Sequence, residues 1–347
     1  MSEYDIKSMT LPEVKSVMRE LGQPEFRAGQ IYQWLQVHGA MDYSEMTNIS
    51  KQLREVLSEK YPIRYCAIEL KQVSKIDGTV KYLFRLCDGN FIESVLMKYK
   101  YGYTLCISSQ VGCKMGCVFC ASTKSGCVRS LYPSEMIGQI HAAQRDMNIR
   151  VSHVVMMGMG EPLDNLDEVL KALELLTATY GYAWSPKRIT LSTVGLRKGL
   201  QRFIEENDCH LAISLHSPLT VQRAELMPAE KAFSITEMVE LLKNYDFSKQ
   251  RRLSFEYIVF KGLNDSQVYA KELLKLLRGL DCRVNLIRFH AIPGVDLEGA
   301  DMDTMTRFRD YLTSHGLFTT IRSSRGEDIF AACGMLSTAK QEKNNES

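Results

Sequence analysis

Cys113-Lys-Met-Gly-Cys117-Val-Phe-Cys120 is the stretch around which the rest of the sequence is organised. Its cysteines have the spacing Cys-x3-Cys-x2-Cys and lie in a short segment that also contains Gly112 and Gly116. Thiolates are the usual ligands of iron–sulfur clusters, and a [4Fe–4S] cluster has four irons to ligate. Three cysteines hold three of these irons and leave the fourth open to a small molecule. Such a cluster can be a reaction centre as well as an electron carrier.

A zinc site is the main alternative for these cysteines. Zinc prefers four protein ligands, and Cys106, Cys127 or Cys333 could supply the fourth. Zinc sites commonly present two Cys-x2-Cys pairs, whereas this sequence has one. Three neighbouring thiols without a metal are a weaker alternative, because free cysteines seldom cluster in reducing compartments. The spacing favours an iron–sulfur cluster.

The composition is that of a globular protein in a reducing compartment. The chain has 347 residues, of which 45% are hydrophobic and 24% charged, which is enough for one large domain and an accessory one. It has no apolar run near 18 residues and no basic and apolar start typical of a signal peptide. Ten cysteines without export indicate reduced thiols, so we expect a cytoplasmic protein with no membrane contact.

Several cysteines outside the central stretch need no chemical role. We interpret Cys66, Cys87, Cys209 and Cys282 as core thiols because their sequence contexts are apolar or strand-like. Cys127 is interpreted as a core or loop thiol.

The distribution of charge is more informative than the net charge of +2. Between Glu93 and Glu135 there is no acidic residue. The basic and aromatic residues of this stretch are Lys98, Lys100, Lys114, Lys124 and Arg129, with Tyr99, Tyr101, Tyr103, Phe119 and Tyr132. Such interleaving suits phosphate contacts and base stacking, although a solvated basic loop is the alternative. Its overlap with the cysteine stretch favours a polyanionic substrate.

The first 62 residues predict a small helical domain. Thr10 is the expected N-cap of a helix that starts at Leu11, and Glu13 stands at the capping-box position. Two more helices are predicted, from Arg27 to Trp34 and from Ile49 to Leu57. Residues 63–97 then predict a linking antiparallel β segment. Its strands lie at 67–70, 79–86 and 91–97, with Asp-Gly turn signals between them.

From residue 98 to 339 the pattern alternates between strand and helix. The predicted strands are 103–109, 151–157, 188–193, 209–215, 251–260 and 282–289, apolar as in strands covered on both faces. The predicted helices are 133–147, 165–178, 195–206, 234–245 and 266–278. Six strand–helix units indicate an α/β fold with a partial (βα)6 barrel, and ligands of such sheets sit at the carboxyl ends of the strands. Asn165 is the expected N-cap of one helix. Residues 340–347 form a polar tail predicted to be disordered.

Polar residues follow several of these strands. Gly160 and Glu161 come after the second strand, where glycine allows close backbone approach and a carboxylate can bind an ammonium group. Ser192 ends the third strand, and Ser214-Leu215-His216 ends the fourth. Each alone could be ordinary capping chemistry. Together, beside the cysteine stretch, they predict a nucleoside pocket.

The spacing Cys113, Cys117, Cys120 is the signature of the radical SAM superfamily. Two further stretches, Cys106-Ile-Ser-Ser-Gln-Val-Gly-Cys113 and Arg325-Gly-Glu-Asp-Ile-Phe-Ala-Ala-Cys333-Gly, closely resemble the RNA adenosine C2-methyltransferases of the RlmN type. The resemblance covers nearly the whole chain. It implies a radical SAM catalytic domain over 98–339, an RNA-contacting domain over 1–62, one [4Fe–4S] cluster on the three cysteines, and two molecules of S-adenosylmethionine per turnover.

The same resemblance assigns the residues at the strand ends. It implies that Gly160 and Glu161, Ser192, and Ser214, Leu215 and His216 contact S-adenosylmethionine. The family usually has asparagine where this chain has His290, and a core or loop histidine is the alternative at that position.

The resemblance further implies a route through two cysteines. Cys333 first accepts a methyl group, which a deoxyadenosyl radical converts to a methylene radical that adds to adenine and crosslinks protein and RNA. Glu93 matches the family's proton acceptor, and Cys106 resolves the crosslink with a transient Cys106–Cys333 disulfide. Core thiols are the alternative for both cysteines, and an exposed strand residue is the alternative for Glu93.

The implied substrates are adenosine 2503 of 23S rRNA and adenosine 37 of certain tRNAs, whose base must leave its stack to react. We also expect a monomer that needs a reducing system. Three other functions are open: a Cfr-type C8-methyltransferase, a radical SAM enzyme acting on a small molecule, and a zinc-stabilised RNA-binding protein. Gly160-Glu-Pro-Leu-Asp-Asn165 favours the C2 enzymes over the C8 group, which resembles Gly-Glu-Ala there.

Overall fold

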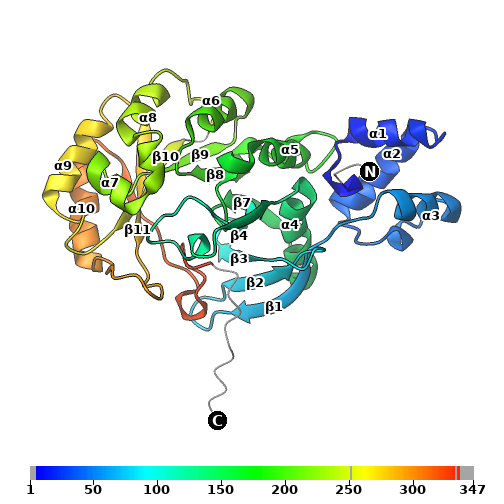
Figure 1. Cartoon of the computed structure of the whole chain (residues 1–347), viewed down its shortest axis with the longest axis horizontal. Helices are drawn as coiled ribbons and strands as arrows, with labels where there is room; N and C mark the ends of the chain where they lie inside the picture. Colours follow the sequence, from blue (N-terminus) through cyan, green and yellow to red (C-terminus); the bar gives the residue numbers. More distant parts are fainter. Residues whose placement is uncertain (1–4, 251, 333, 337–347) are drawn as a thin grey trace, which may run out of the picture.

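One ten-stranded sheet organises the described part of the chain, with the strand order β1-β2-β3-β4-β7-β8-β9-β10-β11-β12 (Figure 1). The structure is a computed structural model that describes residues 5–250, 252–332 and 334–336. Cys333 and the polar tail at 340–347, both singled out from the sequence, lie outside the described residues. Among the helices of the described ranges, none is long and apolar enough to cross a membrane.

The parallel part of this sheet is the predicted partial barrel. Its strands are β4 (Gly102–Cys106), β7 (Val151–Met156), β8 (Ile189–Thr193), β9 (His210–Ser214), β10 (Leu253–Val259), β11 (Cys282–Arg288) and β12 (Thr319–Ile321). Each pairs in parallel with the next. The six predicted strands are confirmed. The seventh, β12, was not predicted, since three residues carry too little periodicity to identify a strand.

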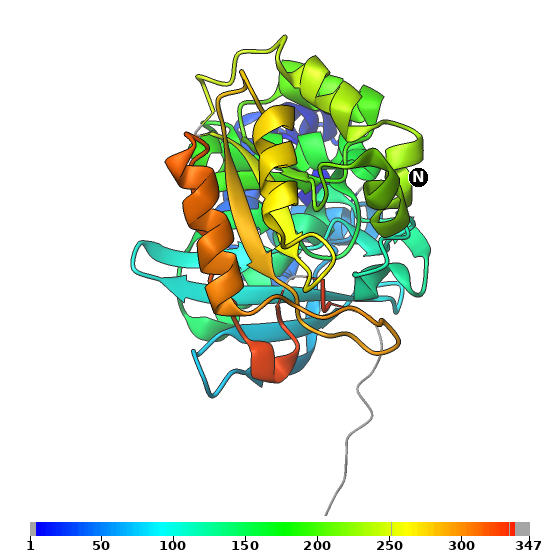
Figure 2. The same cartoon turned by 90° about the vertical axis from the view of Figure 1, so that its left-hand side faces the viewer.

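Helices cover the outer face of the barrel (Figure 1). They are α4 (Pro133–Met147), α5 (Leu166–Thr177), α6 (Arg197–Glu206), α7 (Thr220–Leu226), α8 (Ile235–Leu242), α9 (Gln267–Leu276) and α10 (Met302–Ser314). The sequence predicted all except α7 and α10, and α10 packs beside α9 (Figure 2). Asn165 precedes α5, but its side chain does not cap the helix. Its Nδ2 instead donates to the carbonyls of Ser109 and Leu131, and so ties two loops together.

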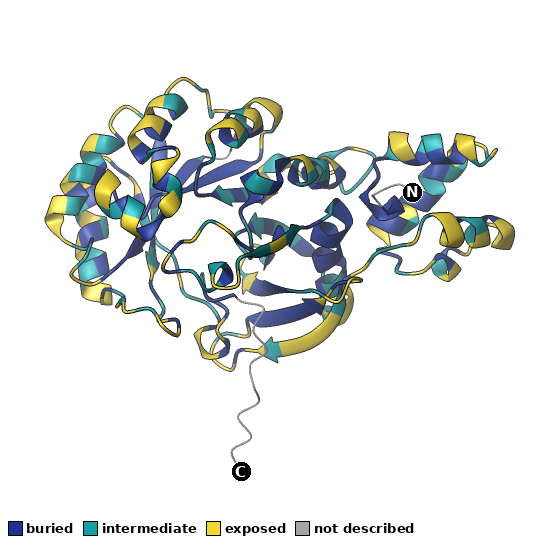
Figure 3. Cartoon of the chain, viewed as in Figure 1, coloured by how far each residue is buried: buried dark blue, intermediate teal, exposed yellow. Residues whose placement is uncertain are grey.

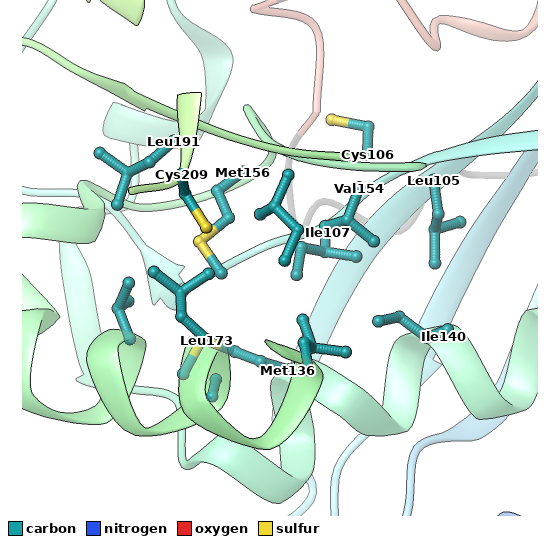
Figure 4. Packing of buried hydrophobic residues seen from close by; sticks show 14 of the residues in the cluster. Leu105, Cys106, Ile107, Met136, Ile140, Val154, Met156, Leu173, Leu191 and Cys209 are labelled. Atoms are coloured by element: carbon teal, nitrogen blue, oxygen red, sulfur yellow. The ribbon is translucent and has the colours of Figure 1, made fainter. Parts of the chain in front are cut away.

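The barrel strands have one apolar and one polar face, which corrects the expectation of apolar residues on both. Successive side chains of a strand point to opposite faces. Leu105 and Ile107 point toward the helices and pack near Met136 and Ile140, whereas Cys106 points to the other side (Figure 4). The inner face therefore lines a lumen, where the polar side chains of the strands can meet ligands.

Three antiparallel strands extend the barrel sheet at one edge. They are β1 (Ala67–Val73), β2 (Val80–Arg85) and β3 (Phe91–Tyr99), and β3 pairs with β4. The predicted linking β segment is thus continuous with the barrel, and β1 is its exposed edge (Figure 3). Cys87 lies in the turn between β2 and β3 and is exposed, so its prediction as a core thiol was wrong. Cys66, Cys209 and Cys282 are buried as predicted.

The N-terminal region contains α1 (Leu11–Glu20), α2 (Phe26–Tyr32) with a following π-helical turn, and α3 (Lys51–Lys60). The capping box of Thr10 and Glu13 is formed as predicted. Glu13 also accepts a hydrogen bond at 2.7 Å from Lys171 on α5, so the region is tied to the barrel. The domain boundary at residue 62 stays a prediction.

Candidate active site

The three cysteines of the central stretch line one cavity of about 140 Å³ inside the carboxyl end of the barrel. We call it the cluster cavity. Its other lining residues include Gly160, Glu161, Ser192, Ser214 and His216. The three thiols and the polar residues predicted to bind a nucleoside therefore line the same cavity.

The thiols of this cavity fit a cluster ligand set. Burial raises the pKa of Cys113 to about 12 and also raises the pKa of Cys117, and the neighbouring thiols add to both effects. Such thiols become thiolates when a metal compensates their charge. Within the described ranges, no three His, Cys, Asp or Glu side chains gather tightly enough to hold a single metal ion. In a [4Fe–4S] cluster each thiolate binds a different iron, so the ligands stand apart around it.

The C-terminal segment packs on the cysteine loop. Ala121, next to Cys120, donates its N–H to the Gly334 carbonyl at 2.8 Å, and Ser122 Oγ donates to the Leu336 carbonyl at 2.7 Å. Gly334 also lines the cluster cavity. The chain thus returns from β12 to the cysteine loop immediately after position 333.

Gly160 and Glu161 are held by the neighbouring strand ends. Gly160 has φ +101°, and a Cβ there would lie 2.6 Å from the Cβ of Gln110, so only glycine fits. The Glu161 carboxylate accepts hydrogen bonds from Thr193 Oγ1 at 2.5 Å and from the N–H groups of Val194 and Leu163 at 2.9 and 3.0 Å. Burial raises its pKa to about 7.

His216 is a buried, neutral residue in the cluster cavity. Its Nδ1 accepts a hydrogen bond from the Ile258 N–H at 3.0 Å, which leaves the proton on Nε2. Burial, and then the charge of Arg223, lower its pKa to about 3. Its φ is +54°, an unusual value for a residue other than glycine. In this tautomer Nε2–H is the hydrogen-bond donor of a side chain that lines the cluster cavity.

Two of the predicted cofactor contacts lie elsewhere. Leu215 is fully buried and does not line the cluster cavity. Its N–H and carbonyl are bonded to Glu256 and Arg223. His290 lines the neighbouring cavity, where its Nε2 is 2.8 Å from Ser324 Oγ. The roles that the resemblance implies for these two residues stay predictions.

Arg223 is the residue that sequence reasoning missed. It lies fully buried on α7, which was itself not predicted. Its Nε and Nη2 donate to the carbonyls of Leu215, Val194 and Ser214 at 3.0, 3.0 and 2.7 Å, and its Nη1 is paired with the buried Glu230. One guanidinium therefore holds the ends of β8 and β9. No sequence signal marks it, because the acceptors are main-chain carbonyls.

A second cavity adjoins the first and contains Cys106. We call it the Cys106 cavity. It shares Met157, Ile287 and Arg322 with the cluster cavity, and Ala332 also lines it. Cys106 is 8% exposed. The two residues that flank Cys333 in sequence thus face one cavity each, Ala332 the Cys106 cavity and Gly334 the cluster cavity.

Glu93 is buried on β3 and not exposed, which removes the alternative considered from the sequence. Its carboxylate lies 2.9 Å from the Lys81 ammonium, which also donates to the Phe330 carbonyl at 3.2 Å. Glu93 and Val95 share a face of β3, and Val95 stands opposite Cys106 in the sheet. Glu93 therefore faces the same side of the sheet as Cys106.

The basic stretch is partly neutralised by the fold. Lys114 pairs with Asp164 at 2.8 Å, and Arg129 pairs with both Asp88 and Glu135. Tyr101, in contrast, stays 61% exposed. Tyr101 is therefore the most exposed aromatic residue of this stretch.

Two family models match this chain, one at its N-terminus and one over the barrel. The family model described as "Ribosomal RNA large subunit methyltransferase N-terminal domain" matches residues 4–63, and the Radical SAM superfamily model matches residues 107–277. The chain is 69% identical to the probable dual-specificity RNA methyltransferase RlmN of Bacteroides thetaiotaomicron, covering 100% of both chains. It is 43% identical to the protein of the same name from Lachnoclostridium phytofermentans, covering 98% of this chain and 96% of that one.

A solved structure extends the likeness to three dimensions. The crystal structure of a radical SAM methyltransferase from Sphaerobacter thermophilus is 37% identical and superposes with a TM-score of 0.92, covering 97% of this chain and 100% of that one. Sequence identity over the full length and this shared fold lead to one conclusion. The chain belongs to the RlmN family of radical SAM RNA methyltransferases.

Proposed function

We propose that this protein methylates C2 of adenosine in 23S rRNA, at adenosine 2503, and in tRNA, at adenosine 37. The observation that carries the proposal is the pair of adjoining cavities, one with the three cysteines and one with Cys106. Ala332 lines the Cys106 cavity and Gly334 lines the cluster cavity. A route that uses both a cluster and two thiols requires such an arrangement.

Cys113, Cys117 and Cys120 would hold a [4Fe–4S] cluster, and Gly160, Glu161, Ser192, Ser214 and His216 would bind S-adenosylmethionine beside it. When bound, the two cofactors supply one-electron cleavage of a sulfonium, a reactivity able to functionalise a poorly nucleophilic ring carbon. The protein contributes orientation: Arg223 fixes the strand ends, and His216 offers a neutral N–H.

Cys106, Cys333 and Glu93 would act on the RNA side. Cys333 carries the methyl group that becomes the new carbon, and the Cys106 thiol resolves the protein–RNA bond. Glu93 takes the proton that leaves C2, and its place on the same side of the sheet as Cys106 supports this role. Lys81 holds the Glu93 carboxylate in position at 2.9 Å.

The proposal includes three finer points: a cytoplasmic location, a monomeric enzyme, and an external reductant for the cluster and the transient disulfide. A cytoplasmic location fits rRNA and tRNA substrates and cysteines that are mostly buried.

The test is mass spectrometry of the Cys333 peptide from anaerobically purified protein, compared with Cys106→Ala. We expect a methyl group on Cys333 in the wild type and a covalent RNA fragment on the same peptide in Cys106→Ala. Cys282→Ala, which removes another buried thiol, is the matched control and should carry no RNA. An unmodified Cys333 and no adduct, in protein with a full iron and sulfide content, would contradict the proposal. Locating the methyl group on product adenosine separates C2 from C8 methylation.

A further inference from the structure

A third cavity, of about 380 Å³, occupies the amino-terminal half of the barrel lumen. We call it the basal cavity. The strand residues that line it are mostly polar: Thr104, His153, Thr190, His210, Ser254, Glu256, Asn285 and Thr320. It shares Met157, Glu256 and Arg322 with the cluster cavity. With the Cys106 cavity it shares Tyr99, Met157, Arg322 and Ser323. The basal cavity thus adjoins the proposed reaction site, yet none of the predicted site residues lines it.

Positive charge surrounds the basal cavity. Lys187, Arg188, Arg252 and Arg322 line it, and Glu256 is the one carboxylate among its described lining residues. Glu256 lies 3.6 Å from Arg322, so its charge is already matched. Lys187 and Arg188 are exposed, and no second carboxylate stands among the described residues that line the cavity with them. A cavity with unmatched cations at its rim attracts an anion such as a phosphodiester.

An aromatic surface lies beside these cations. The rings of Tyr99 and Tyr101 stack with centroids 5.1 Å apart and an interplanar angle of 5°, and the Arg325 guanidinium lies 5.2 Å from the Tyr99 ring centroid. Tyr101 is 61% exposed although it lines the cavity. Thr104 Oγ1 is buried there with no hydrogen-bond partner among the described residues. An exposed ring beside cations is the usual platform for an unpaired nucleotide.

We propose that the basal cavity binds the nucleotide adjacent to the target adenosine, with its base on Tyr101 and its phosphate on Lys187 and Arg188. The proposal rests on the RNA substrate proposed above. Tyr99 is one of the residues that line both the basal and the Cys106 cavity, so the two cavities share a wall, as suits neighbouring nucleotides of one strand. An unpaired strand can follow this path, whereas a stacked duplex cannot enter the lumen.

The first test measures binding of a stem-loop RNA with an unpaired loop adenosine to the full-length protein, by fluorescence anisotropy across a salt series. The Lys187→Gln/Arg188→Gln double variant removes two cations. We expect binding roughly 5-fold weaker at 0.1 M salt and a salt slope lower by about 0.7, because the two cations contact one phosphate and each phosphate contact on a single strand contributes about 0.7. The matched control, Lys275→Gln/Arg278→Gln, removes the same charges from the exposed end of α9 and should bind as the wild type does.

The second test separates base stacking from charge. Tyr101→Ala should bind the RNA roughly 5- to 100-fold more weakly, and Tyr101→Phe within about twofold of the wild type, because stacking needs the ring and not the hydroxyl. Replacing the 5′ or the 3′ neighbour of the target adenosine by an abasic residue should abolish the Tyr101→Ala effect for one of the two RNAs. Both RNAs bind the wild type through the remaining contacts.

The outcomes distinguish the two proposals. If the wild type methylates the stem-loop while the Lys187/Arg188 and Tyr101 variants bind it as tightly as the α9 control, the basal cavity proposal is overturned and the proposed function stands. A wild type with a full cluster that neither binds nor methylates any of these RNAs contradicts the proposed function itself.

Discussion

Replacing Arg223 by methionine tests whether the strand ends at the active site depend on one buried charge. The guanidinium is fully buried and donates to the carbonyls of Val194, Ser214 and Leu215 as well as to Glu230. Methionine has a similar length but no donor, so three carbonyls lose their partner. The Glu230 carboxylate stays buried without its counter-charge.

The magnitude follows from that buried carboxylate. Breaking a buried ion pair by removing one partner costs about 3–5 kcal/mol. The unfolding entropy is about 2 cal/mol/K per residue, or roughly 0.7 kcal/mol/K for 347 residues. The melting temperature should therefore fall by roughly 4–7 °C. S-adenosylmethionine should also bind more weakly, because Ser214 lines the cluster cavity.

The assay is calorimetric unfolding under anaerobic conditions, with binding of S-adenosylmethionine measured on the same samples. Arg202→Met is the matched control, since Arg202 pairs with Glu206 on the exposed face of α6, where water and salt screen the pair. A melting temperature of Arg223→Met within 1 °C of that control would refute the reasoning. It would mean that water or a rearranged loop replaces the guanidinium at no cost.

Three further predictions concern single residues of the site. The pKa of His216 is about 3 in the folded protein and about 6.5 in the unfolded chain, so the stability that its neutral form contributes is present above pH 6.5 and is lost as the pH falls. Between pH 6 and pH 5, the free energy of unfolding should therefore fall by about 1 kcal/mol less in His216→Gln than in the wild type, as measured by urea titration. Equal losses would contradict this. Lys81→Met removes the ammonium group 2.9 Å from Glu93, so it should slow RNA methylation and leave Cys333 methylation intact. Lys81→Arg keeps the charge and should retain partial activity. Equal rates of RNA methylation for Lys81→Met and the wild type would rule out a positioning role for Lys81. Gly160→Ala should lower the free energy of unfolding by about 1–3 kcal/mol and weaken S-adenosylmethionine binding. Gly29→Ala, in open space on α2, is the control and should be neutral or stabilising. Similar behaviour of the two variants would show that the protein easily relieves the contact between a Cβ at position 160 and Gln110.

Local patterns account for most of what could be predicted. The cysteine spacing singled out three thiols that line one cavity, and strand–helix alternation identified six barrel strands and five of its outer helices. Elements with weak periodicity escaped: α7 has seven residues, and β12 has three. Cys87 was misassigned because apolar neighbours in the sequence do not bury a residue that lies in an exposed turn between two strands.

The sequence by itself determined the chemistry of this protein, because metal-ligand spacing, strand-end glycines and turn residues act over a few positions. Only the tertiary structure decided which distant residues meet. Arg223 binds main-chain carbonyls that any sequence would provide, and Lys81 finds Glu93 through strand register. The basal cavity arises where residues between 99 and 323 converge on one lumen. Such contacts depend on the curvature of the sheet, which is a property of the packed barrel and not of any segment of it.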